Sequence, residues 1–99
     1  MAGIISFSSL RVAAYPSYLA YAYEGLLDEV ATWATPLSSS DITAIYNSGA
    51  PADLDSYSPV NWWRMGDNDG GTGTTITDEG SGGDDGTLTN GPAFSTDVP

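Results

Sequence analysis

The sequence predicts a mainly β protein with one short α-helix and a Gly/Asp/Thr-rich, extended C-terminal half. Apolar and aromatic residues alternate with a period of two in short stretches bounded by Gly, Pro and Ser, as in strands. One segment, about 39–47, instead has the three- and four-residue apolar spacing of a helix. Residues 66–91 hold nine of the 12 glycines and six of the 13 acidic residues. Such a segment contains too few apolar side chains to bury a core of its own.

Length and composition limit how this fold can be stabilised. With 99 residues the chain has room for one small structural unit. It contains neither cysteine nor histidine, which excludes disulfides, thiolate or imidazole metal sites and imidazole acid–base chemistry. We therefore expect self-association, or docking on a larger assembly, to complete the core.

The charge balance favours a basic partner. Two arginines, no lysine and 13 acidic residues give a formal net charge of −11. A surface of this sign repels phosphate backbones and anionic lipid, so nucleic-acid and membrane partners are not expected. No apolar run approaches the roughly 20 residues that span a bilayer. The start of the chain lacks the basic region of a secretory signal, which predicts synthesis in a cytoplasm without an export address.

Three strands are predicted before the helix. Residues 3–9 and 18–23 are the first two, and 26–33 form the third after an interruption at Gly25. Alternation along 26–33 places Asp28 and Glu29 on opposite faces. They are therefore not expected to form a glycosidase carboxylate pair, whose members face each other across one bond.

The helix carries start and stop signals at both ends. Ser38 and Asp41 have the spacing of an N-terminal capping box. An Asn-Ser-Gly triplet after Tyr46, reinforced by Pro51, predicts the C-terminal stop. Because so short a helix is unstable alone, its apolar face is expected to pack on something. That face consists of Ile42, Ile45 and Tyr46.

The C-terminal half is predicted to hold one aromatic strand and two short edge strands. The aromatic strand is 60–65, and the edge strands are 74–78 and 86–89. The chain thus divides into 1–58, with the N-terminal strands and helix, and 59–99, with the aromatic strand and a Gly/Asp-rich arm. We expect the two parts to form one small structural unit.

Two groups of residues resemble concanavalin A-like (laminin-G-like) jelly-roll domains, of the kind found in tailed-bacteriophage virion proteins. The closing strand and helix of that fold resemble Gly25-Leu26-Leu27-Asp28-Glu29-Val30-Ala31-Thr32-Trp33, Leu37-Ser38, Asp41-Ile42 and Ile45-Tyr46-Asn47. Its opening strand and the turn that follows resemble residues 62–66, 73–78, 80–84, 86–92 and Phe94.

The resemblance implies a reduced jelly-roll-like sheet. The chain would keep the strands that meet at the termini of that fold and lack most of the sandwich between them. Glycan and calcium sites of the family usually lie on loops between the missing strands, so none of them is carried over.

Three aspartates have a spacing that echoes a calcium-binding loop: Asp67, Asp69 and Asp78. Gly71 and Thr72 depart from the pattern, since they stand where a ligand and the turn glycine are required. A helix–loop–helix site is therefore not expected. An irregular calcium site that includes Asp84 or Asp85 stays open beside a solvated acidic loop.

The candidate interface residues are mostly aromatic: Trp33, Tyr46, Trp62, Trp63, Arg64 and Phe94. Because side chains alternate along a strand, only one of Trp62 and Trp63 can be core in a one-sided sheet. The other is expected to cover a neighbouring subunit or bind a ligand. Enrichment of aromatics at protein interfaces favours the subunit over a sugar-stacking platform.

The resemblance implies a structural role in a virion. The expected function is a capsid decoration (cement) protein on the outer surface of the particle, which bridges subunits of the major capsid protein. The C-terminal half would be an arm ordered on binding, and a homotrimer is expected. The alternatives are a carbohydrate-binding fragment of a tail fibre or adhesin, and a truncated remnant without a role of its own. No enzymatic activity and no cofactor are expected.

Overall fold

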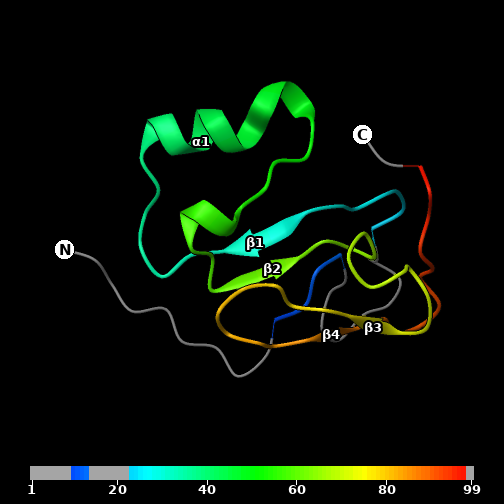
Figure 1. The fold of residues 1–99 in the computed structure, drawn as a ribbon. Helices are drawn as coiled ribbons and strands as arrows, with labels where there is room; N and C mark the ends of the chain where they lie inside the picture. The colour runs from blue at the N-terminus through cyan, green and yellow to red at the C-terminus, as the bar shows by residue number, and fades with distance from the viewer. Residues whose placement is uncertain (1–9, 14–22, 98–99) are drawn as a thin grey trace.

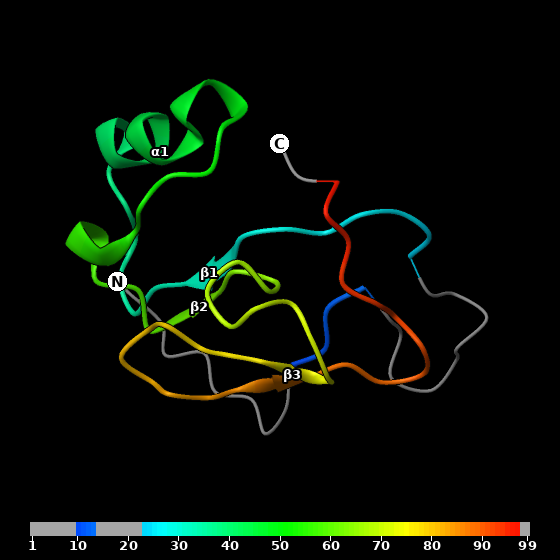
Figure 2. The same cartoon turned by 45° about the vertical axis from the view of Figure 1, so that its right-hand side comes forward.

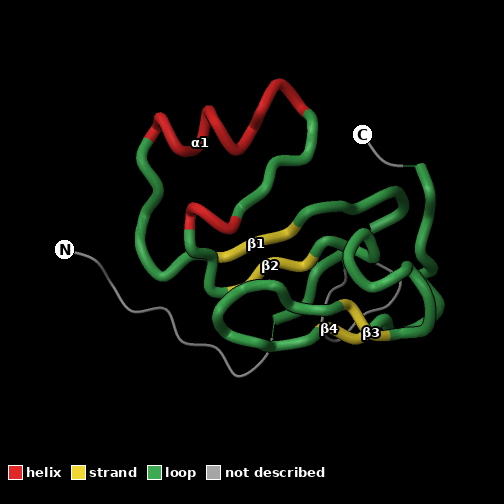
Figure 3. The backbone as a smooth tube through the Cα atoms, in the orientation of Figure 1, coloured by secondary structure: helices red, strands yellow, loops and turns green. Residues whose placement is uncertain are grey.

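A computed structural model describes residues 10–13 and 23–97, so the predicted strand 3–9 and most of the predicted strand 18–23 lie outside the described residues. The described chain is mostly loop, with two small sheets and one α-helix (Figures 1 and 3). The elements are β1 (Val30–Thr32), α1 (Ser39–Tyr46), β2 (Asn61–Trp63), β3 (Thr75–Ile76) and β4 (Gly86–Thr87), with single 3-10 turns at Asn47–Gly49 and Asp55–Tyr57.

Both sheets are antiparallel pairs. β1 pairs with β2 in a register that places Ala31 opposite Trp62, and β3 pairs with β4 with Ile76 opposite Gly86. An isolated bridge joins Trp63 of β2 to Asp78, two residues after the end of β3. In both ribbon views α1 lies on one side of the β1–β2 pair, and the β3–β4 hairpin lies on the other (Figures 1 and 2). The mainly β prediction is confirmed at the level of a small β protein with one helix.

The strands are shorter than predicted because two residues adopt left-handed backbone conformations. Glu29 has φ 51° and Met65 has φ 53°, which no strand residue adopts. β1 therefore begins at Val30 and β2 ends at Trp63, instead of covering 26–33 and 60–65. The period of two that placed Asp28 and Glu29 on opposite faces does not extend to them.

The helix prediction is confirmed almost to the residue. Ser38 Oγ accepts from the Asp41 amide at 3.1 Å, and the Asp41 carboxylate accepts from the Ser38 amide, so both halves of the capping box form. Asn47 adopts the left-handed conformation (φ 44°) and ends the helix after Tyr46. Among the described residues, no helix has the length and apolarity needed to cross a membrane.

The described residues of the single chain do not supply the predicted packing for the whole apolar face of this helix. Ile42 is 56% exposed and Tyr46 is 68% exposed, and only Ile45 is half-buried. In Figure 2 the helix stands away from the sheet, connected to it by loops on both sides. The described part of the chain leaves this face without a partner.

The core is small and partly polar. Leu54, Pro59 and Trp62 are its buried apolar residues among those described, and Asn61 and Asp78 are buried beside them. Because Asp78 belongs to the Gly/Asp-rich half, that half is not the wholly extended arm that its composition suggested. Its middle section is held against β2, and it forms the β3–β4 hairpin.

Candidate functional site

Asp78 is the centre of a hydrogen-bond network beneath β2. Its two carboxylate oxygens accept from the Trp62 amide and Asn61 Nδ2, each at 2.7 Å, and from the amides of Gly80 and Asp84, each at 2.8 Å. Burial alone would raise the pKa of Asp78, but these four donors outweigh it and hold the pKa below its ordinary value. A buried carboxylate with its acceptor sites filled in this way is a structural group.

Glycines let this segment approach the β2 backbone closely. A Cβ on Gly80 would lie 2.6 Å from Asn61 Cα and would also collide with the Val60 carbonyl, and one on Gly82 would lie 2.9 Å from Asn61 Nδ2. The Gly82 amide donates to the Val60 carbonyl at 2.7 Å. Side chains at these two positions would separate Asp78 from its donors.

The three aspartates of the calcium-like spacing are distributed over different contacts. Asp78 is occupied as described above. Asp69 accepts from the backbone amides of Thr77 and Gly71 and from the Thr77 hydroxyl, and these bonds lower its pKa. Asp67 pairs with Arg64 at 3.6 Å. Within the described ranges these three do not converge on one point.

The two further aspartates considered for calcium also serve the Asp78 network. Asp84 accepts from Asn61 Nδ2 at 3.1 Å, and Asp85 accepts from the Asp78 amide at 2.9 Å. The Gly-Gly-Asp-Asp stretch therefore closes a polar loop around Asn61 and Asp78.

All three tryptophans donate their indole N–H groups inside the molecule. The Trp33 indole donates to the Tyr57 carbonyl (3.0 Å), the Trp62 indole to Glu29 Oε2 (2.6 Å) and the Trp63 indole to the Asp84 carbonyl (2.9 Å). Trp62 is 4% exposed, whereas Trp63 is half-buried. As the alternation of side chains predicted, one of this pair is core. The polar edges of these rings are engaged by the fold itself.

Arg64 and Phe94, the remaining interface candidates besides Tyr46, make internal contacts as well. Arg64 Nε lies 3.3 Å from Glu29 Oε1, and its guanidinium carbon lies 5.1 Å from the centre of the Trp62 ring. Phe94 lies over Gly66, where a Cβ would approach its ring to 2.8 Å. Of the six predicted interface residues, Tyr46 is the one that the described structure leaves largely exposed.

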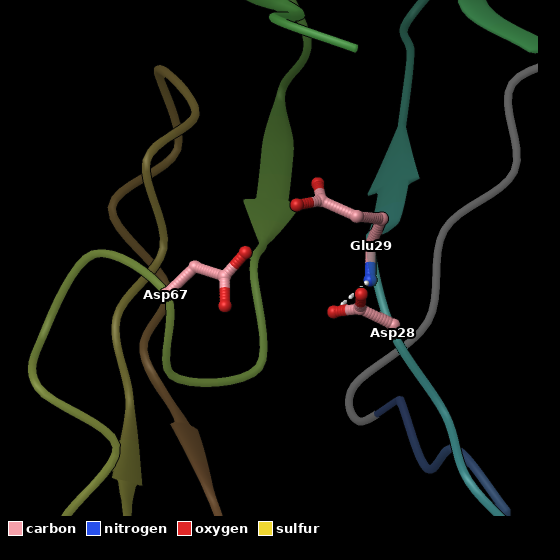
Figure 4. A group of neighbouring side chains, drawn as sticks. All are labelled: Asp28, Glu29 and Asp67. Atoms are coloured by element: carbon pink, nitrogen blue, oxygen red, sulfur yellow. Dashed lines mark hydrogen bonds between the residues drawn. The ribbon is translucent and has the colours of Figure 1, made fainter. Parts of the chain in front are cut away.

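The folded chain brings together an acidic group that sequence reasoning missed. One carboxylate oxygen from each of Asp28, Glu29 and Asp67 lies within 4.8 Å of the others (Figure 4). The expectation that Asp28 and Glu29 diverge is wrong, because the left-handed Glu29 breaks the alternation and its amide donates to Asp28 Oδ1 at 3.0 Å. Met65, which follows β2 and lies two residues before Asp67, is also left-handed. Neither conformation could be predicted from the sequence, because neither residue is a glycine.

Within this group Asp28 has an unfavourable environment. Burial, followed by the charges of Glu29 and Asp67, raises the pKa of Asp28 despite the amide bond and the nearby Arg64. Its Oδ2 atom is buried and has no hydrogen-bond partner among the described residues. An incoming cationic donor would lower the free energy of this carboxylate.

Beside the acidic group runs a groove of about 350 Å³ between the end of α1 and β1. Its apolar lining includes Ala31 and Trp33 from the strand side, Ile45 from the helix and Leu54 from the connecting segment. Asp28 and Glu29 also line it. The groove therefore has apolar walls and an acidic end. It suits a peptide segment in which an aliphatic side chain lies next to a cationic one.

Comparison of the chain with protein-family models, with curated proteins and with solved structures finds no match.

Proposed function

We propose that this chain is a structural protein of a tailed-phage virion, a capsid decoration protein that binds the outer surface of the head and bridges coat subunits. The observation that carries the proposal is the uncovered apolar face of α1, where Ile42 and Tyr46 are exposed on a helix with a complete capping box. A short helix is maintained by packing of its apolar face. A protein that leaves this face open is suited to gain stability by docking.

The composition of the core supports the same conclusion. Three buried apolar residues in the described part of the chain are few for an independent domain. Exposed apolar side chains also occur before β1, at Leu26 and Leu27. A net charge of −11 favours a basic patch on the coat subunit, and association of the chain with itself as a trimer would cover further apolar surface.

The internal contacts of the tryptophans weigh against a sugar-stacking role. Glycan sites commonly combine an open aromatic face with free polar groups, but the three indole N–H groups here are engaged internally and Trp62 is buried. We therefore do not propose carbohydrate binding, and it is one of the outcomes that the following experiment distinguishes.

The test is co-sedimentation of the purified chain with mature heads of a tailed phage whose genome encodes it. We expect the chain to pellet with heads and to raise the temperature at which they release DNA. Ile42→Asp with Tyr46→Asp should lose binding, whereas Ala44→Asp, on the opposite side of α1, should keep it.

Heads that leave the chain in the supernatant would overturn the proposal. Pelleting with tails instead, reversed by a soluble glycan, would transfer the chain to the carbohydrate-binding class. Equal binding by the double variant and the Ala44→Asp control would remove α1 from the interface.

A further inference from the structure

The groove between α1 and β1 sets the chemistry of what it can bind. Trp33, Ile45 and Leu54 provide apolar walls, and Asp28 and Glu29 provide an acidic end. Glu29 already accepts from Trp62 and pairs with Arg64, but Asp28 makes no ion pair in the described part of the chain. An occupant should therefore place an aliphatic side chain in the groove and a guanidinium or ammonium at Asp28.

The chain itself carries a segment of this composition. It contains two arginines, and Arg64 is committed to Glu29 and Asp67. The other, Arg11, is exposed, and its neighbours Leu10 and Val12 are apolar yet 46% and 42% exposed. Because all three residues are exposed in the single chain, the segment does not fill the groove of its own copy.

We propose that the groove receives residues 10–12 of a second copy of this chain, with Leu10 or Val12 against Trp33 and Ile45, and with Arg11 at Asp28. The inference rests on the proposed function, because it assigns the surfaces through which the decoration protein would associate with itself. It places the Arg11 guanidinium beside the one carboxylate of the acidic group that has no ion pair among the described residues.

Such an interface joins two different surfaces of the molecule and is therefore heterologous. Head-to-tail contacts of this kind close into a ring when the rotation between copies allows it. A cyclic trimer is such a ring of three copies. The net charge of −11 opposes association, but salt screens distant charges beyond about 8 Å at physiological ionic strength and leaves the contact pair largely unscreened. Association should therefore be concentration-dependent and specific to the pair.

The experiment is the mass of the full chain by light scattering and sedimentation over a concentration series in physiological salt. We expect the wild type to rise above the monomer mass with concentration. Arg11→Glu should weaken association about tenfold or more, since it places like charges together. Asp28→Arg should weaken it similarly, and the double variant should restore it by reversing the pair.

A matched control separates the effect of losing the Arg11–Asp28 contact from the effect of the change in net charge. Arg11→Glu changes the charge by two units, as does the pair Thr72→Glu and Thr74→Glu at exposed positions before β3. The control should associate like the wild type. A wild type that stays monomeric throughout, an Arg11→Glu variant that associates as strongly as the wild type, or a control that fails equally would each overturn the inference.

Head binding is read separately, so the two proposals can fail independently. A monomeric wild type that still pellets with heads would overturn self-docking and leave the decoration role in place. A chain that associates through Arg11 and Asp28 but ignores heads would support the interface and overturn that role.

Discussion

The Trp62 amide donates to Asp78 Oδ1 across a distance of 2.7 Å, although the two residues are 16 positions apart in the sequence. This bond joins the strand that carries the buried tryptophan to the Gly/Asp-rich segment. Asp78 is itself only 8% exposed, and three further donors share its carboxylate. A segment too polar to form an apolar core is thus ordered by one carboxylate that satisfies backbone and side-chain donors together.

Asp78→Ala should therefore be strongly destabilising. It leaves buried donors without an acceptor, and each such group costs about 1–3 kcal/mol, so we expect a loss of at least about 3 kcal/mol in the free energy of unfolding. Urea unfolding followed by tryptophan fluorescence measures it. Asp97→Ala, at an exposed position near the C-terminus, should change stability by less than about 0.5 kcal/mol. Similar curves for the two variants would contradict the role of Asp78.

Gly80→Ala tests the close approach of this segment to β2. The added methyl group would meet Val60 and Asn61 backbone atoms, which cannot move away cheaply, so we expect a loss of about 1–3 kcal/mol or more. Gly86→Ala is the matched control, because its methyl group would lie 3.5 Å from Ile76 Cβ, an ordinary contact, and neither glycine has a positive φ. Thermal unfolding of both variants should show a large fall in Tm for the first alone.

The local elements of this chain could be predicted from its sequence, and its tertiary contacts could not. The capping box at Ser38 and the stop after Tyr46 are local features, so spacing located α1 correctly. The predicted edge strands 74–78 and 86–89 correspond to β3 and β4, which are only shorter. The predicted strand ends were wrong near Glu29 and Met65. These non-glycine residues adopt left-handed conformations that composition does not reveal.

The candidate site was harder to predict for the same reason. The proximity of Asp67 to Asp28 and Glu29 depends on the pairing of β1 with β2 and on both left-handed residues. The calcium-like spacing of Asp67, Asp69 and Asp78 was visible in the sequence, but it gave no indication that backbone amides would take up Asp69 and Asp78. Resemblance to a jelly-roll domain pointed to a β fold, which is the part that the structure confirms.

Ser38→Ala should destabilise α1. It removes the side-chain oxygen that accepts from the Asp41 amide, and loss of an N-cap typically costs about 1 kcal/mol. Helical circular dichroism and Tm should both fall. Ser40→Ala, inside the first turn of the same helix, should leave Tm unchanged or raise it slightly, because alanine is the better helix former. Equal effects at the two serines would contradict the cap.

Asp28→Asn should stabilise the protein at neutral pH. The folded state raises the pKa of Asp28, so ionisation is less favourable there than in the unfolded chain, and wild-type stability is lost as the pH rises through the folded pKa. Asparagine keeps an oxygen for the Glu29 amide without the charge. We expect Tm to rise by a few degrees at pH 7 and the gain to vanish below about pH 3, where Asp28 is protonated in both states.

Asp53→Asn is the control for that substitution. Asp53 is exposed and its Oδ1 accepts from the Asp55 amide at 2.9 Å, a local bond that asparagine also preserves. Its Tm at pH 7 should lie close to that of the wild type, because the position is exposed and the local bond is kept. A gain at Asp28 that is the same at pH 3 and pH 7 would show that the charge is not its cause.

The opposite pH dependence is expected at Asp78. Its pKa is lowered in the folded state, so its contribution to stability is fully present above the unfolded value of about 3.9 and is lost as the pH falls through the folded pKa. Asp78→Asn, which cannot ionise, should be less stable than the wild type at pH 7, and the two should converge as the solution is acidified below about pH 4. Urea midpoints at pH 7, 5 and 3 measure this convergence. A difference between the two proteins that stays constant over this range would mean that the shape of the Asp78 side chain, and not its charge, holds β2.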